Sequence, residues 1–198
     1  GYIKSCKAQI EAKEERDAKV YFIPGEGDRA SQALQKGLKN AVSIDVAAHR
    51  FTYKALVSGI RTRLDGGAKV RLGVDDDLYW AGKGQLVGGN DANEAKTVAD
   101  LTSRGLEARY METNHVAKLL HHNKFVVFHN PEGAGDTAFV GSGNFTGAGF
   151  SDNLENFYLI GVPHVVEALA TQYEHLYEDL ATPPEHMPTE LVVPEGGG

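Results

Sequence analysis

Apolar residues along this chain recur at two spacings, short unbroken runs and longer stretches in which every third or fourth residue is apolar. The short runs predict β-strands at residues 19–23, 43–48, 69–74, 106–111, 125–128, 137–140 and 157–160. Helical spacing predicts helices at residues 28–41, 53–64, 92–103 and 165–180. Because strands and helices alternate through the first half, we expect an α/β fold with a mixed, mostly parallel β-sheet flanked by helices.

Glycine and proline punctuate these elements and divide the chain into three parts. Pro24-Gly25 ends the first strand, Gly66-Gly67 ends the second helix and Gly105 caps the third. We expect a polar N-terminal arm or helix at residues 1–18, a single catalytic domain at 19–181 and a tail containing proline and glycine at 182–198. Residues 79–89 carry an aromatic pair and several glycines, which predicts a mobile rim.

Composition sets outer bounds on location and partners. The 198 residues contain 41% hydrophobic residues, as soluble globular domains do, and no apolar run long enough to predict a transmembrane segment. The net charge of −7 argues against a strongly basic nucleic-acid surface. Arg50, Lys54, Arg61 and Arg63 could form a local positive patch with Lys124, but we interpret most of them as a solvated helix face. The single Cys6 permits no internal disulfide, so a cytoplasmic location is favoured, with secretion still open if an upstream signal peptide was removed.

Two short motifs carry the chemistry. His122-Asn123-Lys124 precedes the strand at 125–128, and side chains two residues apart in extended chain leave the same face. An imidazole can attack phosphorus and leave again, while an ammonium can neutralise the phosphoryl oxygens. After the strand at 137–140 comes Gly141-Ser142-Gly143-Asn144, where small residues let the backbone turn closely around an anion. The two motifs together predict a phosphodiester site.

These residues resemble the signature of the phospholipase D superfamily, in which His-x-Lys, four residues and an Asp are followed by a Gly-Ser-x-Asn turn. The resemblance spans roughly residues 19–180 and implies a phospholipase D-like domain with metal-independent phosphodiesterase activity. It implies no cofactor and no metal ligand. By this resemblance His122 is the nucleophile, Lys124, Ser142 and Asn144 hold the phosphate, and Glu155 supports the site by fixing the His122 tautomer.

The chain departs from the signature at His129, which stands where the family has its Asp. An imidazole can form hydrogen bonds but carries no permanent negative charge. Asp136 is a candidate substitute if the turn at residues 131–135 folds back. A degenerate, non-catalytic phosphate-binding half therefore remains an alternative.

A run of three carboxylates, Asp75-Asp76-Asp77, follows the third strand. Hard cations prefer clustered carboxylates at strand ends. Consecutive side chains point in different directions, however, and the family chemistry needs no metal, so we expect no metal site here.

A phosphodiesterase of this family uses two His-x-Lys motifs, one histidine attacking phosphorus and the other protonating the leaving oxygen. This chain contains one, so we expect a homodimer that brings together two copies of His122, with a second motif-bearing half as the alternative partner. The compact layout resembles the bacterial endonuclease branch, and we expect a nuclease-type hydrolase. A phospholipase D-type hydrolase or transphosphatidylase acting on phospholipids is the alternative, with Leu78-Tyr79-Trp80 as its candidate membrane-contacting lip.

Overall fold

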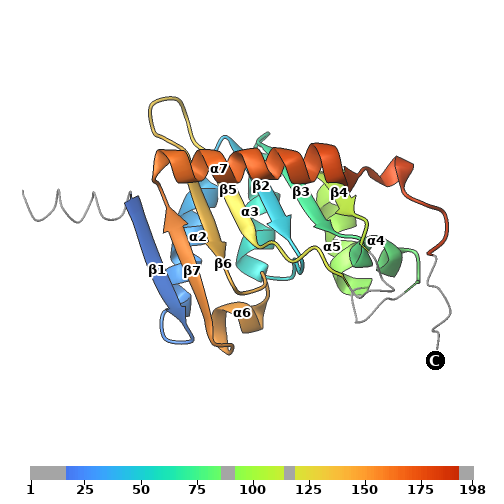
Figure 1. The fold of residues 1–198 in the computed structure, drawn as a ribbon, viewed down its shortest axis with the longest axis horizontal. Helices are drawn as coiled ribbons and strands as arrows, with labels where there is room; N and C mark the ends of the chain where they lie inside the picture. Colours follow the sequence, from blue (N-terminus) through green and yellow to red (C-terminus); the bar gives the residue numbers. More distant parts are fainter. Residues whose placement is uncertain (1–16, 86–91, 114–118, 192–198) are drawn as a thin grey trace, which may run out of the picture.

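The computed structural model describes residues 17–85, 92–113 and 119–191. Most of the expected N-terminal arm, residues 1–16, and the end of the expected tail, residues 192–198, lie outside the described residues, as do 86–91 and 114–118. The described strands form one sheet in the order β1-β7-β6-β5-β2-β3-β4-β8 (Figure 1). Their bounds are β1 Ala18–Ile23, β2 Ser43–Ala48, β3 Lys69–Asp75, β4 Glu107–Met111, β5 Phe125–His129, β6 Thr137–Gly141, β7 Glu155–Ile160 and β8 Ala181–Thr182.

The mixed α/β fold is confirmed, but the expectation of mostly parallel pairing is wrong. Within the described sheet, β2–β3 and β3–β4 pair in parallel, whereas the other five neighbouring pairs are antiparallel. The cause lies in the connections. Helices carry the chain across between β2, β3 and β4, but β5, β6 and β7 follow one another through connections without a long crossover helix, which favours antiparallel neighbours. These three strands also lie between β1 and β2 in the sheet. The helix that connects β1 to β2 therefore joins strands that are not neighbours, and it produces no parallel pair.

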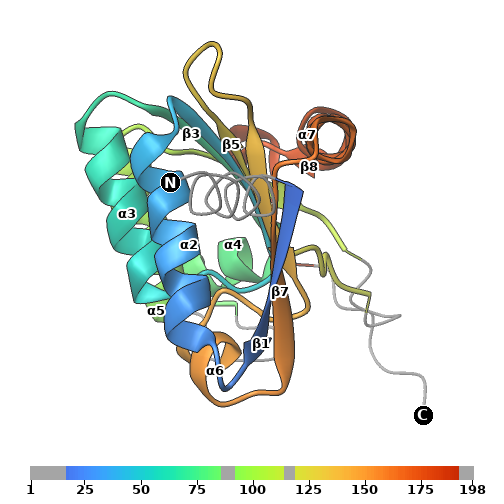
Figure 2. The same cartoon turned by 90° about the vertical axis from the view of Figure 1, so that its left-hand side faces the viewer.

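Long helices cover both faces of the sheet. Helices α2 (Gly27–Asn40), α3 (Lys54–Asp65) and α5 (Ala92–Ser103) lie on one face, and α7 (Pro163–Glu174) lies on the other (Figure 2). The helix predicted at residues 165–180 changes form near its end, because His175–Leu180 is a π-helical segment. Among the described residues, no helix is both long and apolar enough to cross a membrane.

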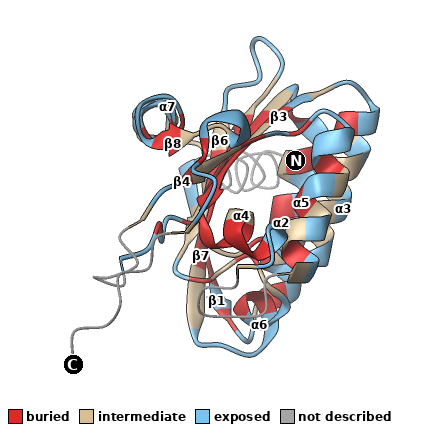
Figure 3. Ribbon diagram, turned by 90° about the vertical axis from the view of Figure 1, so that its right-hand side faces the viewer, coloured by how far each residue is buried: buried red, intermediate tan, exposed pale blue. Residues whose placement is uncertain are grey.

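The hydrophobic core lies on both sides of the central strands, which are largely buried (Figure 3). Val46, Leu72 and Phe128 are fully buried in the larger cluster, which also contains residues of α2, α3 and α5. Phe125 and Tyr173 belong to a second cluster, between the sheet and α7. The near-continuous apolar runs of the central strands therefore reflect burial from both sides.

Two short helices lie where the sequence predicted none, α4 (Asp77–Gly82) and α6 (Gly147–Ser151). The prediction of a mobile rim from residue 79 is wrong over α4. Leu78 and Trp80 are each 2% exposed, and the Trp80 indole donates a hydrogen bond to Asp76 at 3.1 Å. The same burial excludes these two side chains as a membrane-contacting lip, because they are packed into the protein rather than presented to a bilayer.

Candidate active site

The candidate site lies at one edge of the sheet, where β2 and β6 end and β5 and β7 begin. Because β5 runs antiparallel to both β2 and β6, its first residue, Phe125, pairs with Ala47 near the end of β2 and with Val140 near the end of β6. The residue before β5 is Lys124, and the backbone N–H of Gly141 bonds to its carbonyl at 3.3 Å. Strand pairing thus brings together two motifs that are separate in the sequence.

His122 and Lys124 contact one another directly. Lys124 is 5% exposed, and its Nζ lies 2.9 Å from Nδ1 of His122 and donates to the His122 carbonyl at 2.9 Å. The expectation that this spacing produces one converging pair is confirmed. Burial and then the charge of Lys124 lower the pKa of His122. Burial also lowers the pKa of Lys124, and the nearby Glu155 opposes that shift. The site therefore holds a nearly buried ammonium beside an exposed imidazole.

The Gly-Ser-Gly-Asn turn fits closely against β7. The N–H of Ser142 bonds to the carbonyl of Asn156 at 3.0 Å. A side chain at Gly141 would overlap the same carbonyl oxygen, and a Cβ at Gly143 would lie 2.6 Å from the Phe157 ring. Both glycines are therefore required by close approach of the next strand.

Glu155 contacts a different partner from the one expected. Its carboxylate accepts hydrogen bonds from the Ser142 hydroxyl and from Asn153 at 3.3 Å. The atom beside Nδ1 of His122 is the Lys124 nitrogen. Glu155 thus lies in the site and acts on Lys124 through its charge, but in this structure it does not fix the His122 tautomer.

Asn144 is connected to the loop that follows β2. The next residue, Phe145, forms a parallel bridge with Phe51, and its carbonyl accepts the N–H groups of Thr52 at 2.9 Å and Tyr53 at 2.7 Å. These bonds hold the Gly-Ser-Gly-Asn turn against the start of α3.

The same loop brings in a residue that sequence reasoning missed. The ring of His49 lies 5.0 Å from the ring of His122, measured between centroids, with a 54° tilt. Burial, followed by the charges of Arg50, His122 and Lys124, lowers the pKa of His49 to about 4, while a contact with Asn144 opposes the shift. The only sequence signal was a histidine at the end of a predicted strand, which alone is too common to single out.

Asp75 anchors the start of the His-x-Lys segment. Its carboxylate accepts the N–H of His121 at 2.7 Å and that of Asp77 at 3.1 Å. Burial raises the pKa of Asp75 to about 6 in spite of these two donors. His121 is 6% exposed, and burial, followed by electrostatic interactions with His49, Lys124 and His122, lowers its pKa to about 4. Asp75 is thus a positioning residue that the sequence suggested only as a metal ligand.

The three carboxylates of Asp75, Asp76 and Asp77 gather more closely than expected. Each offers one oxygen, and these oxygens all lie within 4.8 Å of one another, so the argument from diverging directions is wrong. The set has the donor chemistry of a hard-cation site. Asp76, however, already accepts bonds from Trp80 at 3.1 Å and Thr113 at 3.2 Å, which gives it a structural role.

The arginines near α3 contribute little to this site. Arg61 pairs with Asp100 at 2.8 Å, and Arg63 donates to the carbonyl of Ala41 at 2.5 Å. Arg50 lies closer, because its charge lowers the pKa of His49, and it pairs with Glu94 at 3.6 Å. Among the described residues, Lys124 and Arg50 both bring positive charge close enough to lower the pKa of His49.

Comparison with known proteins identifies the family. The family described as "Cardiolipin synthase, PLD-like domain" matches residues 34–177, which include His122, Lys124, Ser142, Asn144 and Glu155. The chain belongs to the phospholipase D superfamily. No curated protein matches it by sequence.

Solved phospholipase D-like structures share the fold. Nuc from Salmonella typhimurium, a phospholipase D family member, is 20% identical, with a TM-score of 0.64 over 84% of this chain and 97% of Nuc. NucT from Helicobacter pylori is 16% identical, with a TM-score of 0.67 over 84% of this chain and 98% of NucT. Phosphatidylserine synthase from Haemophilus influenzae is 14% identical, with a TM-score of 0.60 over 84% of this chain but 39% of that one. The chain thus resembles Nuc and NucT over nearly their whole lengths.

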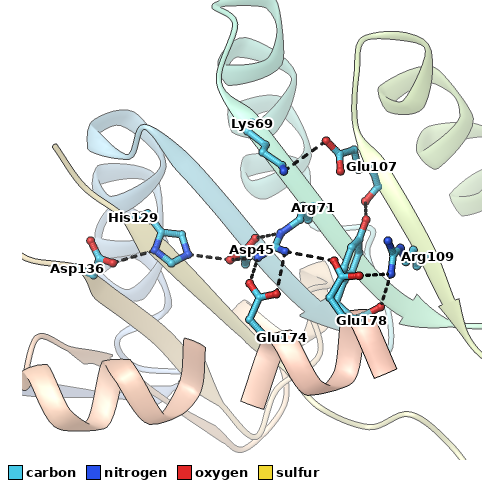
Figure 4. A network of polar contacts seen from close by, with 10 residues as sticks. Asp45, Lys69, Arg71, Glu107, Arg109, His129, Asp136, Glu174 and Glu178 are labelled. Carbon is cyan, nitrogen blue, oxygen red and sulfur yellow. Dashed lines mark hydrogen bonds and ion pairs between the residues drawn. The ribbon is translucent and has the colours of Figure 1, made fainter. Parts of the chain in front are cut away.

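His129, at the position of the superfamily Asp, ends β5, whereas Lys124 directly precedes β5. Its ring bridges two carboxylates, with Nε2 2.7 Å from Asp45 and Nδ1 2.8 Å from Asp136 (Figure 4). The turn at residues 131–135 folds back, because Asp136 also accepts the N–H of Asn130 at 2.9 Å. Asp45 in turn pairs with Arg71 at 2.7 Å. The substitution therefore sits in an ion-pair network facing α7, separated from His122 by the length of β5.

Proposed function

We propose that this chain is a metal-independent phosphodiesterase that acts through a covalent phosphohistidine at His122, and that it is a nuclease-type hydrolase. The observation that carries the proposal is the meeting of His122, Lys124 and the Gly-Ser-Gly-Asn turn at one edge of the sheet. An exposed imidazole next to a nearly buried ammonium combines a nucleophile with a charge that attracts a phosphodiester.

The reaction proceeds in two displacements. A ring nitrogen of His122 forms a bond to phosphorus while the P–O bond to the leaving group breaks, and the leaving oxygen receives a proton. Water then attacks phosphorus and gives a proton back to the group that protonated the leaving oxygen, the N–P bond breaks, and the products are a phosphomonoester and the free imidazole. Lys124, Ser142 and Asn144 hold the non-bridging oxygens, whose charge is greatest in the transition state.

Substrate binding must change the contact between Lys124 and His122. An ammonium that donates to Nδ1 favours the tautomer with the proton on Nε2, which leaves no lone pair there for attack. A bound phosphodiester offers Lys124 anionic oxygens, and the ammonium moves to them. Nδ1 then takes the proton, and the Nε2 lone pair is free to attack phosphorus.

The protonation step requires a second acid, and we propose that a second copy of the chain supplies it as His122. A two-fold axis at this edge of the sheet would place the same residue of each copy in one cleft. A different motif-bearing half is the alternative partner. Analytical ultracentrifugation gives the mass, and mixing the wild type with excess His122→Ala, followed by subunit exchange, tests for shared sites because each mixed dimer holds a single His122. Activity per wild-type subunit that stays constant in the mixture would contradict the shared site.

The arrangement of the motifs along the chain favours a nucleic acid as the substrate. The Gly-Ser-Gly-Asn-Phe-Thr segment with its following Asn-x-Glu-Asn resembles the endonuclease branch, and the similarity of fold to Nuc and NucT over nearly their whole lengths supports the same choice. A phospholipid substrate is the second candidate, because Leu154 is 89% exposed beside Glu155, and Leu119 and Leu120 are 59% and 48% exposed shortly before His122. Because Leu78 and Trp80 are buried, these exposed leucines become the candidates for the apolar membrane contact that a lipid enzyme needs.

The deciding experiment measures cleavage of a chromogenic bis-aryl phosphodiester in excess chelator. His122→Ala is compared with the wild type and with the control His164→Ala. His164 is an exposed histidine on α7, which begins shortly after β7 ends, whereas Glu155 lies at the other end of β7. We expect turnover in the wild type and in His164→Ala, and none in His122→Ala. Full activity in His122→Ala would refute the assignment, and the absence of turnover in every protein would favour a non-catalytic phosphate-binding half. Single-stranded DNA and phosphatidylcholine vesicles then separate the two substrate classes.

A further inference from the structure

A second imidazole, besides that of His122, lies at the proposed phosphate site. His49 directly follows β2 and is half-buried, with its ring 5.0 Å from the ring of His122. It is also close enough to Lys124 and Asn144 for both to influence its pKa. Any phosphoryl group held by His122, Lys124 and Asn144 therefore lies next to His49.

The position of His49 is fixed from two sides. The carboxylate of Glu94, on α5, accepts the N–H of Phe51, and its other oxygen lies 3.6 Å from Arg50. Phe51 also bridges to Phe145, directly after the Gly-Ser-Gly-Asn turn. Glu94 is 3% exposed, so this anchor is sealed from water. These contacts hold the backbone directly after His49 and so place this residue beside the site before a ligand binds.

The ring nitrogens of His49 are not equivalent. Nδ1 is buried and has no hydrogen-bond partner in the described part of the structure, and the same holds for Oδ1 of Asn144. Nε2 is not among the buried unpaired atoms, and a phosphoryl oxygen can only accept a hydrogen bond, so a phosphoryl ligand at Nε2 selects the tautomer with the proton on that nitrogen. Nε2–H is then the donor that this ring can offer to a ligand.

We propose that His49 is a further substrate-contacting residue, a neutral imidazole whose Nε2–H donates a hydrogen bond to a non-bridging phosphoryl oxygen of the substrate. The inference rests on the proposed phosphodiesterase function and adds a phosphate ligand from outside both motifs. A general-acid role fits less well. With its pKa near 4, roughly one ring in a thousand is protonated at neutral pH. A neutral donor avoids placing another full cation beside Lys124.

The test compares two substitutions at this position. His49→Gln keeps an N–H donor, whereas His49→Phe keeps a ring without one, and His164→Phe serves as the control for loss of a histidine. Inorganic phosphate binding is measured by calorimetry, and kcat and KM are measured with the chromogenic diester. We expect His49→Phe to weaken phosphate binding and to lower kcat/KM by about 10- to 100-fold. We expect His49→Gln to recover most of both, and His164→Phe to match the wild type.

The outcomes separate this inference from the proposed function. If turnover requires His122 but His49→Phe equals the wild type in phosphate affinity and kcat/KM, the role of His49 is refuted and the phosphodiesterase assignment stands. If turnover does not require His122, the assignment fails, and phosphate affinity alone decides the role of His49. Equal losses in His49→Phe and His49→Gln, or no phosphate binding by the wild type, also refute it. Circular dichroism checks folding, and His49→Ala replaces His49→Phe if the latter is unfolded.

Discussion

Nε2 of His129 lies 2.7 Å from Oδ2 of Asp45, and this contact joins the end of β5 to a carboxylate buried in β2. The hydrogen bond to Asp45, with help from Asp136, raises the pKa of His129 although burial opposes it. Burial acts to raise the pKa of Asp45, but its bonds to His129 and Arg71 bring the net shift below the usual value. The imidazole that replaces the family Asp therefore lies between two carboxylates that favour its protonated form.

Restoring the family residue should destabilise this protein. His129→Asp would place a third carboxylate beside Asp45 and Asp136 and remove both hydrogen bonds. We expect the free energy of unfolding at pH 7 to fall by about 2 to 3 kcal/mol in urea titrations, because like charges meet near a buried site. His175→Asp, at an exposed histidine paired with Asp179, should cost far less. Equal costs would contradict a special role for the network.

Stability should also depend on pH through His129. Because the folded pKa lies above the ordinary value of 6.5, the network contributes its full stability below pH 6.5 and loses it as pH rises through the folded pKa. We expect the wild type to lose its advantage over His129→Gln between pH 6.5 and the higher folded value. Urea titrations of both proteins from pH 6 to 9 measure the difference. An advantage that is constant over this range would show that His129 is neutral in the folded protein.

Removing the ammonium from the site should change both chemistry and titration. Lys124→Met keeps an apolar stem but removes the charge that lowers the pKa of His122. We expect kcat to fall by about 100- to 1000-fold, the range found when a transition-state donor is lost. The pKa of His122, followed by NMR of its ring protons, should rise. Lys69→Met, at an exposed lysine on β3 paired with Glu107, should leave both unchanged. An unaltered His122 titration in Lys124→Met would contradict the contact.

The first glycine of the Gly-Ser-Gly-Asn turn should tolerate no side chain. A Cβ at Gly141 would overlap the Asn156 carbonyl, whereas a Cβ at Gly147 has nothing within 4 Å. We expect Gly141→Ala to lower the free energy of unfolding by about 2 kcal/mol or more, because backbone must move, and to impair phosphate binding. Gly147→Ala should be neutral or slightly stabilising, since alanine favours the helix that begins there. Thermal unfolding of the two variants provides the comparison.

Glu94 should support the site from outside it. Glu94→Ala leaves the N–H of Phe51 without its acceptor, which should cost about 1 to 3 kcal/mol of stability and lower kcat/KM by loosening the segment that carries His49. Glu94→Gln retains an acceptor oxygen for the N–H of Phe51, and the charge that it gives up is one that burial disfavours, as the raised pKa of Glu94 indicates. We expect Gln to restore most of the loss in kcat/KM. Identical kinetics in Glu94→Ala and the wild type would refute the positioning role.

Several elements could be predicted from the sequence because their signals are local. The strand at 43–48 and the helix at 92–103 have the predicted bounds, since their apolar spacing and flanking residues act within the segment. The pairing of His122 with Lys124 likewise follows from a spacing of two residues. The short helix α4 was missed because its stability comes from burying Leu78 and Trp80 against distant residues, which its glycine-rich surroundings do not indicate.

By itself, then, the sequence determined the family, the motif residues and most element positions, because these depend on local spacing and residue chemistry. Tertiary structure alone decided which strands became neighbours, and with that which side chains met. Pairing between β2 and β5 places Asp45 next to His129 and His49 next to His122, although about eighty residues of chain separate the members of each pair. Such long-range register is set by burial of the whole sheet and by its connections, and a local pattern contains no information on it.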